Sequence, residues 1–137
     1  MAIMISLLFS KMIFSSYQTE KVMESFGNVY YLQYASFTSK EVMNDNIKKL
    51  DNYLLYEIDN KYYVYLGIYR NLDIARKMNI LFENNGLYTY IKNDYISDSS
   101  IIDVINDCDE EILEEDNTNE IFEINKKCIE LIKRRVS

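Results

Sequence analysis

Between residues 29 and 92, the apolar positions switch between the two-residue period of strands and the wider spacing of helices. Four short runs are rich in aromatic and branched side chains, which favour strands. These runs are residues 29–37 (VYYLQYASF), 53–58 (YLLYEI), 62–69 (YYVYLGIY) and 87–92 (LYTYIK). Helix-like patterns follow the first and the third run, so the predicted order is β-α-β-β-α-β.

Local signals mark the ends of the two predicted helices. Thr38 and, three residues later, Glu41 form a capping box, and the apolar positions after it continue to about Leu50. Asn71 can cap the second helix, and Gly86 suits the left-handed position that follows a helix. Both helices therefore have a predicted beginning and end.

The second and third strands are separated by Asp59, Asn60 and Lys61, whose turn chemistry predicts a β-hairpin. The whole order favours an α+β fold with a four-stranded antiparallel sheet and two helices on one face, as in RNP-like or ferredoxin-like folds. Helices that cover one face of a sheet leave the other face available for a ligand.

Two further helical stripes follow in residues 94–137. Apolar side chains recur at helical spacing in residues 101–112 and again in residues 121–132, and polar residues 116–119 interrupt the pattern. This arrangement predicts an αα-hairpin at the C-terminal end of the chain.

Cys108 and Cys128 lie on these two stripes, and in an antiparallel hairpin they would face inward at the same level. The favoured interpretation is a pair of small buried side chains, because free Cys is among the most buried residue types. The alternative is a disulfide formed in an oxidising compartment, which requires a close local approach of the two helices.

Residues 2–14 (AIMISLLFSKMIF) are strongly apolar, but the run is shorter than the roughly 20 residues that span a bilayer and it contains Lys11. One interpretation is an amphipathic helix that packs on the domain. The favoured one is the C-terminal part of a membrane anchor whose beginning is missing, with Lys11 reaching the interface. This predicts a single-pass protein of the cell membrane with an extracytoplasmic domain, divided into residues 1–28, 29–93 and 94–137.

Composition narrows the range of functions. The 137 residues include no His, no Pro and three Gly, which excludes Ser-His-Asp and Cys-His catalysis, His-based zinc sites and glycine-rich phosphate loops. The acidic side chains of the predicted hairpin lack the spacing of a calcium loop and are expected to form a solvated helix face. We therefore expect a binding protein that is not an enzyme and has no cofactor and no metal.

The formal net charge of −7 is unevenly distributed. Residues 29–92 carry +1, residues 93–125 carry −12 and residues 126–137 carry +4. The predicted sheet is therefore nearly neutral, and it has neither a basic stripe nor the aromatic motif of RNA-recognition domains. Nucleic acid is not an expected partner.

One run of residues resembles a known family. Leu32, Gln33, Tyr34, Ala35, Ser36 and Phe37, followed by a capped helix, resemble the start of the SPOR (sporulation-related repeat) domain, which opens on an apolar-Gln-apolar-small-Ser-Phe pattern. Further on, residues 63–69 (YVYLGIY), Ala75 and residues 86–88 (GLY) fit its second half. The resemblance covers residues 29–92. This chain departs from the family at Ile68, where Pro is frequent, and at Tyr63 and Tyr65, where basic residues are frequent.

The resemblance implies a module that binds bacterial peptidoglycan, in particular glycan strands stripped of their stem peptides, in cell division or envelope remodelling. The family's Gln and Ser correspond to Gln33 and Ser36, and its aromatic residue to Tyr62 or Tyr63. Strand alternation places Leu32, Val64, Leu66 and Ile68 in the core, and Tyr31, Gln33, Ala35, Tyr63, Tyr65 and Gly67 on the open face. The predicted ligand-binding residues are Gln33, Ser36, Tyr63, Tyr65, Tyr31 and Tyr62.

The alternative is a diverged SPOR-like scaffold that binds proteins and has lost glycan binding. In that case the acidic hairpin, residues 94–137, would contact cell-division or envelope proteins. The expected partners are thus glycan strands, such proteins, and the membrane through the N-terminal segment.

Overall fold

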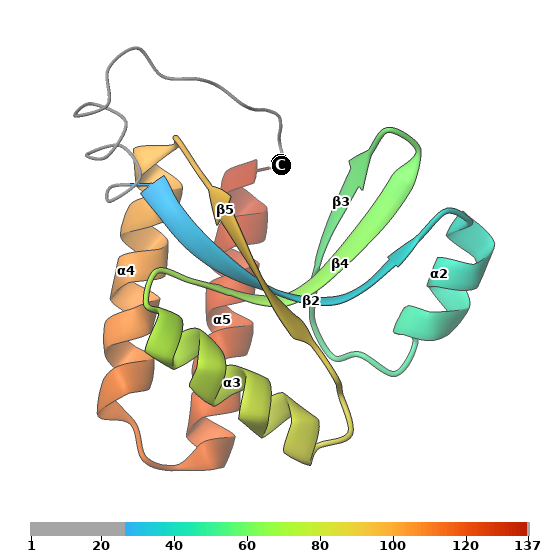
Figure 1. Ribbon diagram of the computed structural model, residues 1–137. Coiled ribbons are helices and arrows are strands. Elements are labelled where there is room, and N and C mark those ends of the chain that lie inside the picture. The colour runs from blue at the N-terminus through green and yellow to red at the C-terminus, as the bar shows by residue number, and fades with distance from the viewer. Residues whose placement is uncertain (1–26, 137) are drawn as a thin grey trace.

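The computed structural model describes residues 27–136 and confirms the predicted α+β fold (Figure 1). The predicted order β-α-β-β-α-β is followed by two long helices. The elements are β2 (Asn28–Phe37), α2 (Lys40–Ile47), β3 (Leu54–Ile58), β4 (Lys61–Tyr69), α3 (Leu72–Asn84), β5 (Tyr90–Tyr95), α4 (Ser99–Glu114) and α5 (Thr118–Val136).

The four strands form one antiparallel sheet in the order β3-β4-β2-β5. The β3–β4 turn has positive φ at Asp59 (52°) and Asn60 (65°), the conformation that a two-residue hairpin turn requires. The pairing of β2 with β4 shifts register after Leu32 and again after Gln33. Each shift changes which face the following side chains occupy.

One face of the sheet, the helix face, carries Leu32, Val64 and Leu66 and is covered by α2 and α3. The caps of both helices explain their positions. Asn71 accepts from the amides of the first turn of α3, as predicted. The N-cap of α2 is Ser39, so the prediction of Thr38 was wrong by one residue. The Ser39 hydroxyl accepts from the backbone amide of Val42 in the first turn of the helix. Leu32, Val64 and Leu66 are buried, as the alternation predicted.

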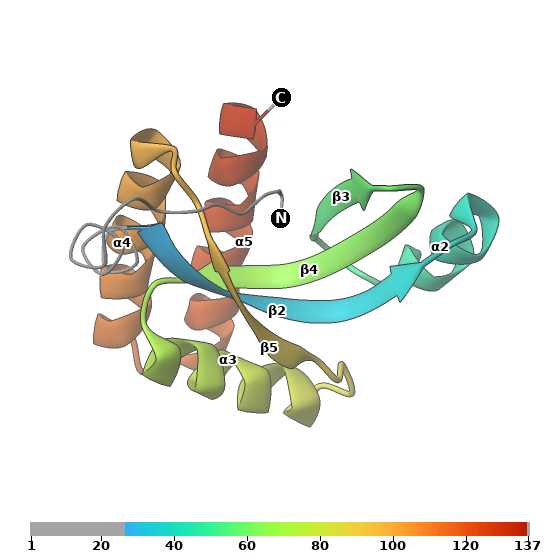
Figure 2. The same cartoon turned by 45° about the horizontal axis from the view of Figure 1, so that its top comes forward.

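The helices α4 and α5 lie side by side at one end of the sheet, and α2 with the β3–β4 hairpin lies at the other end (Figures 1 and 2). The first half of α4 and the second half of α5 pack on the second face of the sheet, which the sequence predicted to be open. The other halves of α4 and α5 contribute Ile112 and Ile121 to the cluster of the helix face. The buried cluster on the second face joins sheet residues to residues of both helices. Its members are Val29, Tyr31, Leu54, Tyr65, Ile68, Ile101, Ile102, Val104, Ile105, Cys108, Cys128, Ile129 and Ile132.

Ile68 lies in this second cluster, whereas Leu66 lies on the helix face. Strict alternation would place these two side chains on the same face. The register shifts between β2 and β4 separate them, and Ile68 pairs with Tyr31. The prediction that Ile68 belongs to the core was confirmed, but the prediction that it shares a face with Leu66 was wrong.

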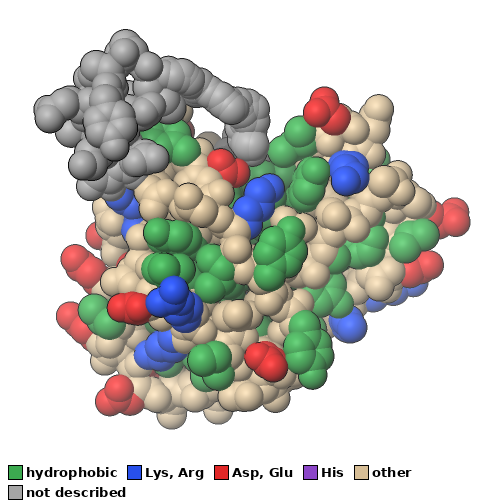
Figure 3. Space-filling model, in the orientation of Figure 1, with side chains coloured by type: hydrophobic (Ala, Val, Ile, Leu, Met, Phe, Trp, Pro, Cys, Tyr) green, Lys and Arg blue, Asp and Glu red, His purple; other side chains and the backbone are tan. Residues whose placement is uncertain are grey.

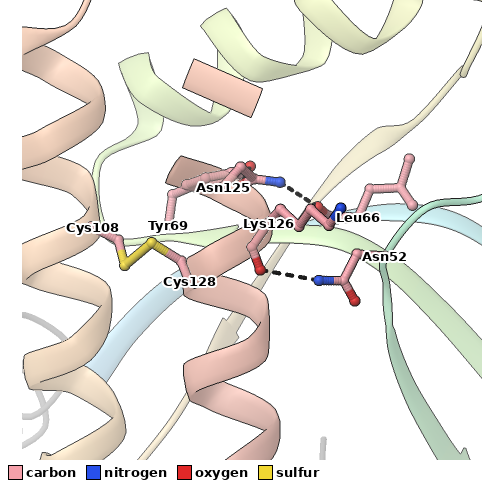
Figure 4. Close-up of a disulfide and its surroundings, with 7 residues drawn as sticks. All are labelled: Asn52, Leu66, Tyr69, Cys108, Asn125, Lys126 and Cys128. Carbon is pink, nitrogen blue, oxygen red and sulfur yellow. Dashed lines mark hydrogen bonds between the residues drawn. A yellow bond between two sulfur atoms is a disulfide. The ribbon is translucent and has the colours of Figure 1, made fainter. Parts of the chain in front are cut away.

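A disulfide joins Cys108 of α4 to Cys128 of α5, with a Cα–Cα distance of 6.2 Å (Figure 4). The favoured interpretation of two free buried side chains was therefore wrong. Both residues face inward at the same level of the antiparallel pair, and the helices approach within the range that a disulfide needs. The bond closes the 20-residue separation between the two positions.

Each helix of this hairpin has a polar side chain that bonds to β4 or to the residues directly after it. The Asp109 carboxylate accepts from the backbone amides of Arg70 (2.7 Å) and Asn71 (2.9 Å). Asn125 accepts from the Tyr69 hydroxyl (2.6 Å) and donates to the carbonyl of Leu66 (3.0 Å), as Figure 4 shows for the second bond. The hairpin is thus held in one position against β4.

The prediction of a single-pass membrane protein needs correction. No helix within residues 27–136 is both long and apolar enough to cross a bilayer. The longest, α5, carries Lys126, Lys127 and the basic residues of its last turn. The apolar run at residues 2–14, on which the prediction rested, lies outside the described residues.

Candidate functional site

The second face of the sheet gathers tyrosines from all four strands. We call it the tyrosine face and define it by Tyr31 (β2), Tyr56 (β3), Tyr63 and Tyr65 (β4) and Tyr90 (β5). The cross-strand pairs Tyr56–Tyr63 and Gln33–Tyr90 and the shared cluster place these side chains on one side. A face of this kind offers flat apolar rings with polar hydroxyls, which suits ligands that combine apolar and hydrogen-bonding surfaces.

Three of these rings pack against each other. The ring centroids of Tyr31 and Tyr65 lie 4.4 Å apart, and Tyr56 meets Tyr31 at 6.0 Å and Tyr65 at 5.5 Å in edge-to-face geometry. Burial raises the pKa of all three hydroxyls above the ordinary value. The three side chains are therefore neutral at physiological pH and act as hydrogen-bonding groups.

Lys92 of β5 adds a positive charge to the tyrosine face. Its Nζ lies 5.0 Å from the ring centroid of Tyr63 and 5.8 Å from that of Tyr65, and it donates to the Tyr65 hydroxyl at 3.4 Å. Asp94 lies on the same side of β5, paired with Val29. Burial lowers the pKa of Lys92 and raises the pKa of Asp94. The negative charge of Asp94 acts to raise the pKa of Lys92, and the positive charge of Lys92 acts to lower the pKa of Asp94, so each charge opposes the effect of burial on the other group.

The tyrosine face has a covered end and an open end. Tyr31 and Tyr65 are 3% and 1% exposed and lie in the cluster formed with α4 and α5. Tyr63 is half-buried, Ser36 is exposed and Tyr90 is 57% exposed. The prediction that Tyr31, Gln33 and Tyr65 lie on an open surface was wrong, because α4 and α5 pack on the face that was expected to be free.

The register shifts of β2 separate the other predicted site residues. Ser36 pairs with Tyr63 and so joins the tyrosine face, whereas Ala35 pairs with Val64 of the helix face. Tyr62 packs in the helix-face cluster, so Tyr63 is the aromatic residue that this strand contributes to the candidate site. The structure thus brings Ser36 and Tyr63 together and places Tyr62 on the opposite side.

Gly67 does not lie on the open face, where strand alternation placed it; it is buried and pairs with Leu32 of the helix face. A Cβ at this position would collide with the ring and hydroxyl of Tyr69. The absence of a side chain therefore makes room for Tyr69, which is buried and bonded to Asn125. The small residue serves packing in the core and does not open the backbone to a ligand.

Sequence reasoning missed Tyr56, Tyr90, Lys92 and Asp94. The predicted last strand ended at Lys92, whereas β5 runs from Tyr90 to Tyr95. Alternation along β5 places Tyr90, Lys92 and Asp94 on one side, opposite Ile91. Tyr56, Tyr90 and Lys92 lay inside the predicted strands, so the face assignment that was applied to β2 and β4 would have found them. Asp94 lies beyond the predicted end of the last strand and also needed the correct boundary.

A hollow lies on the other side of the sheet, between the end of α3, the α2–β3 loop and α5. Its volume is about 220 Å³, and Leu66, Phe82 and Phe122 contribute to its apolar lining. Asn52 closes one wall by donating to the carbonyl of Lys126 (Figure 4). Within residues 27–136, no three Asp, Glu or Cys side chains converge in a way that could hold a metal ion.

Comparison with known proteins found no matching family model, no matching curated protein and no matching solved structure.

Proposed function

We propose that the protein is a non-catalytic module that binds peptidoglycan glycan strands through the open end of the tyrosine face, in cell division or envelope remodelling. The SPOR-like run of residues 32–37 motivates the proposal. The observation that carries it is the chemistry of the surface formed by Ser36, Tyr63, Tyr90 and Lys92. A pyranose ring has an apolar face that stacks on an aromatic ring, and its substituents need donors and acceptors.

Tyr90 is the ring best placed for stacking. It is 57% exposed at the start of β5, and it is the cross-strand neighbour of Gln33. Tyr63 lies two strands away on β4, and the ammonium of Lys92, which comes from the same strand as Tyr90, lies 5.0 Å from the centroid of the Tyr63 ring. The same side of the sheet therefore offers hydroxyl, amide and ammonium groups as well as an exposed ring, which are the groups that carbohydrate recognition uses.

Gln33, a buried residue on the same side of the sheet, also supports the proposal. Its side chain is 5% exposed, and its Oε1 has no hydrogen-bond partner among the described residues. A buried acceptor without a partner costs free energy, so it favours a ligand that brings a donor. Sugar hydroxyl and acetamido groups are such donors.

A binding assay on purified sacculi tests the proposal, with and without amidase treatment to remove stem peptides. We expect the protein to sediment with amidase-treated sacculi, and the variant Tyr90→Ala to lose most of this binding, because it removes the exposed ring on which the sugar would stack. The matched control is Tyr88→Ala, because Tyr88 is 68% exposed but precedes β5. Sedimentation with neither form of sacculus would contradict glycan binding.

The alternative, a scaffold that binds another protein, is favoured by the surface of α4. Acidic side chains line the edge of the molecule where α4 lies (Figure 3). Leu113, which lies between Glu111 and Glu114 in the sequence of this helix, is 64% exposed. Deleting the hairpin would not test this, because α4 and α5 form part of the core. The double variant Leu113→Ser/Glu110→Lys leaves the core intact, and its loss of a partner that the wild type retains would support the scaffold.

A further inference from the structure

The hollow on the helix face is separate from the tyrosine face. Three segments that are far apart in the sequence form it: the end of α3, the α2–β3 loop and α5. Its volume is about 220 Å³, whereas pockets for drug-sized ligands span roughly 300–1,000 Å³. An apolar cavity of about 150 Å³ accommodates one benzene molecule. The hollow therefore has room for one ring-sized group with a short polar end.

The interior of the hollow is apolar. The rings of Phe82 and Phe122, whose centroids lie 5.2 Å apart, contribute to its lining. Leu66 of β4 and Ile129 of α5, which are both buried, also belong to the lining. Water gains few hydrogen bonds from such side chains, so its displacement by an apolar group is favourable. This interior fits an aromatic or a branched apolar side chain.

Two amide side chains that line the hollow are already engaged. Asn125 bonds to β4 through both its oxygen and its nitrogen. Asn52 donates to the carbonyl of Lys126 at 3.0 Å (Figure 4), and its oxygen accepts from the Lys133 ammonium at 2.7 Å. These bonds hold the walls in position before a ligand arrives. The polar groups of a ligand must therefore find their partners at the rim.

The rim carries charges of both signs. Lys49 and Asp51 come from the α2–β3 loop, and Glu123 and Lys126 come from α5; all four line the hollow and are exposed. The ammonium of Lys49 lies 5.8 Å from the ring centroid of Tyr34, whereas Glu123 and Lys126 form no salt bridge within residues 27–136. Residues three positions apart share one side of a helix. An anion and a cation are therefore available together on one wall.

We propose that the hollow binds a free amino acid with an aromatic or branched apolar side chain. The side chain of the ligand occupies the interior, its carboxylate faces Lys126 and its ammonium group faces Glu123. The volume, the apolar lining with engaged amides, and the two charges on one wall all fit this class of ligand. The bound amino acid connects α5 to α3 and to the α2–β3 loop, so it stabilises the folded chain. The site does not depend on glycan binding by the tyrosine face.

An NMR titration of the isotope-labelled full chain with three probes tests the proposal. The probes are L-phenylalanine, glycine, which has both charges but no apolar side chain, and N-acetyl-L-phenylalanine amide, which has the ring but no charge. We expect L-phenylalanine to shift the backbone amides of residues 50–52, 85–87 and 122–126. Glycine should bind at least about tenfold more weakly, because it lacks the group that becomes buried. The neutral amide should bind about fivefold more weakly, because contacts between exposed charges contribute little.

The variant Glu123→Gln/Lys126→Gln removes the two charges and keeps the size of both side chains. It should bind L-phenylalanine and the neutral amide equally. The matched control is Glu120→Gln/Lys127→Gln, which changes two exposed residues of α5 outside the lining and should keep the fivefold preference.

Three outcomes would overturn the inference. If L-phenylalanine shifts none of the residues around the hollow, there is no such site. If the wild type binds the neutral amide as tightly as the amino acid, the occupant is a side chain of a partner peptide and not a free amino acid. If the preference survives in Glu123→Gln/Lys126→Gln, these two residues do not recognise the charges of the ligand. The comparison of probes on the wild type needs no variant, so it is decisive by itself.

Discussion

The two ends of the tyrosine face have the same kind of residues and different surroundings. At the covered end, Tyr31 and Tyr65 pack with Ile68 and the isoleucines of α4 and α5. At the open end, Tyr90 and Ser36 are exposed to solvent. A tyrosine-rich face is therefore not by itself a binding surface. The C-terminal hairpin covers part of it, so the covered tyrosines stabilise the fold and the uncovered ones can contact a ligand.

The largest contrast is expected in stability. Replacing a fully buried aromatic side chain by alanine costs about 3–5 kcal/mol, so Tyr65→Ala should lower the free energy of unfolding by this amount. Tyr90→Ala should change it by about 0.5 kcal/mol or less, because the side chain is largely exposed. Urea denaturation of the two variants measures both values. Equal losses would show that the two ends do not differ in this way.

The disulfide is expected to have the next largest effect. By the chain-entropy relation, a bond that closes a loop of about 20 residues stabilises the folded state by roughly 3 kcal/mol. Reduction of the wild type, or the double variant Cys108→Ala/Cys128→Ala, should lower the free energy of unfolding by about that amount.

Adding a reductant to the double variant is the control, and it should change nothing further. If reduction leaves the wild type as stable as before, the bond between α4 and α5 does not hold the covered end together.

A smaller effect should follow from Asp109, which fastens α4 to the β4–α3 connection. Burial raises its pKa from the ordinary value of 3.8 to about 6. The native state therefore binds the proton more tightly than the unfolded chain, and this contribution makes stability fall as the pH rises from about 4 to about 6. Denaturation across this pH range should show a shallower decline in Asp109→Asn than in Asp103→Asn, an exposed position of the same helix. Equal slopes would show that Asp109 does not titrate in this window.

Much of the architecture was predictable because it depends on local signals. The positive-φ residues Asp59 and Asn60, the cap at Asn71 and Gly86 after α3 each act within a few residues of their own position. The apolar stripes of α4 and α5 likewise predicted their inward faces. Such signals do not depend on the rest of the fold, so the sequence was enough to identify them.

The surface of the site was not predictable, because it depends on contacts between distant parts of the chain. The register shift after Gln33 moves Ala35 and Ser36 to faces that strict alternation does not give. The shift after Leu32 does the same for Gly67 and Ile68 of β4. The docking of α4 and α5 buries Tyr31 and Tyr65 through residues more than 30 positions later. An amphipathic helix shows in its sequence that it packs on something, but not on which face of which sheet.

The most direct test of the account is an NMR titration that maps where a ligand binds. Soluble glycan fragments without stem peptides would be added to isotope-labelled protein, and backbone amide shifts followed along the chain. We expect the largest changes in residues 34–36, 61–65 and 89–93, and small changes in α4 and α5. Changes centred on α4, or none at millimolar ligand, would contradict the claim that the open end of the tyrosine face is the binding site.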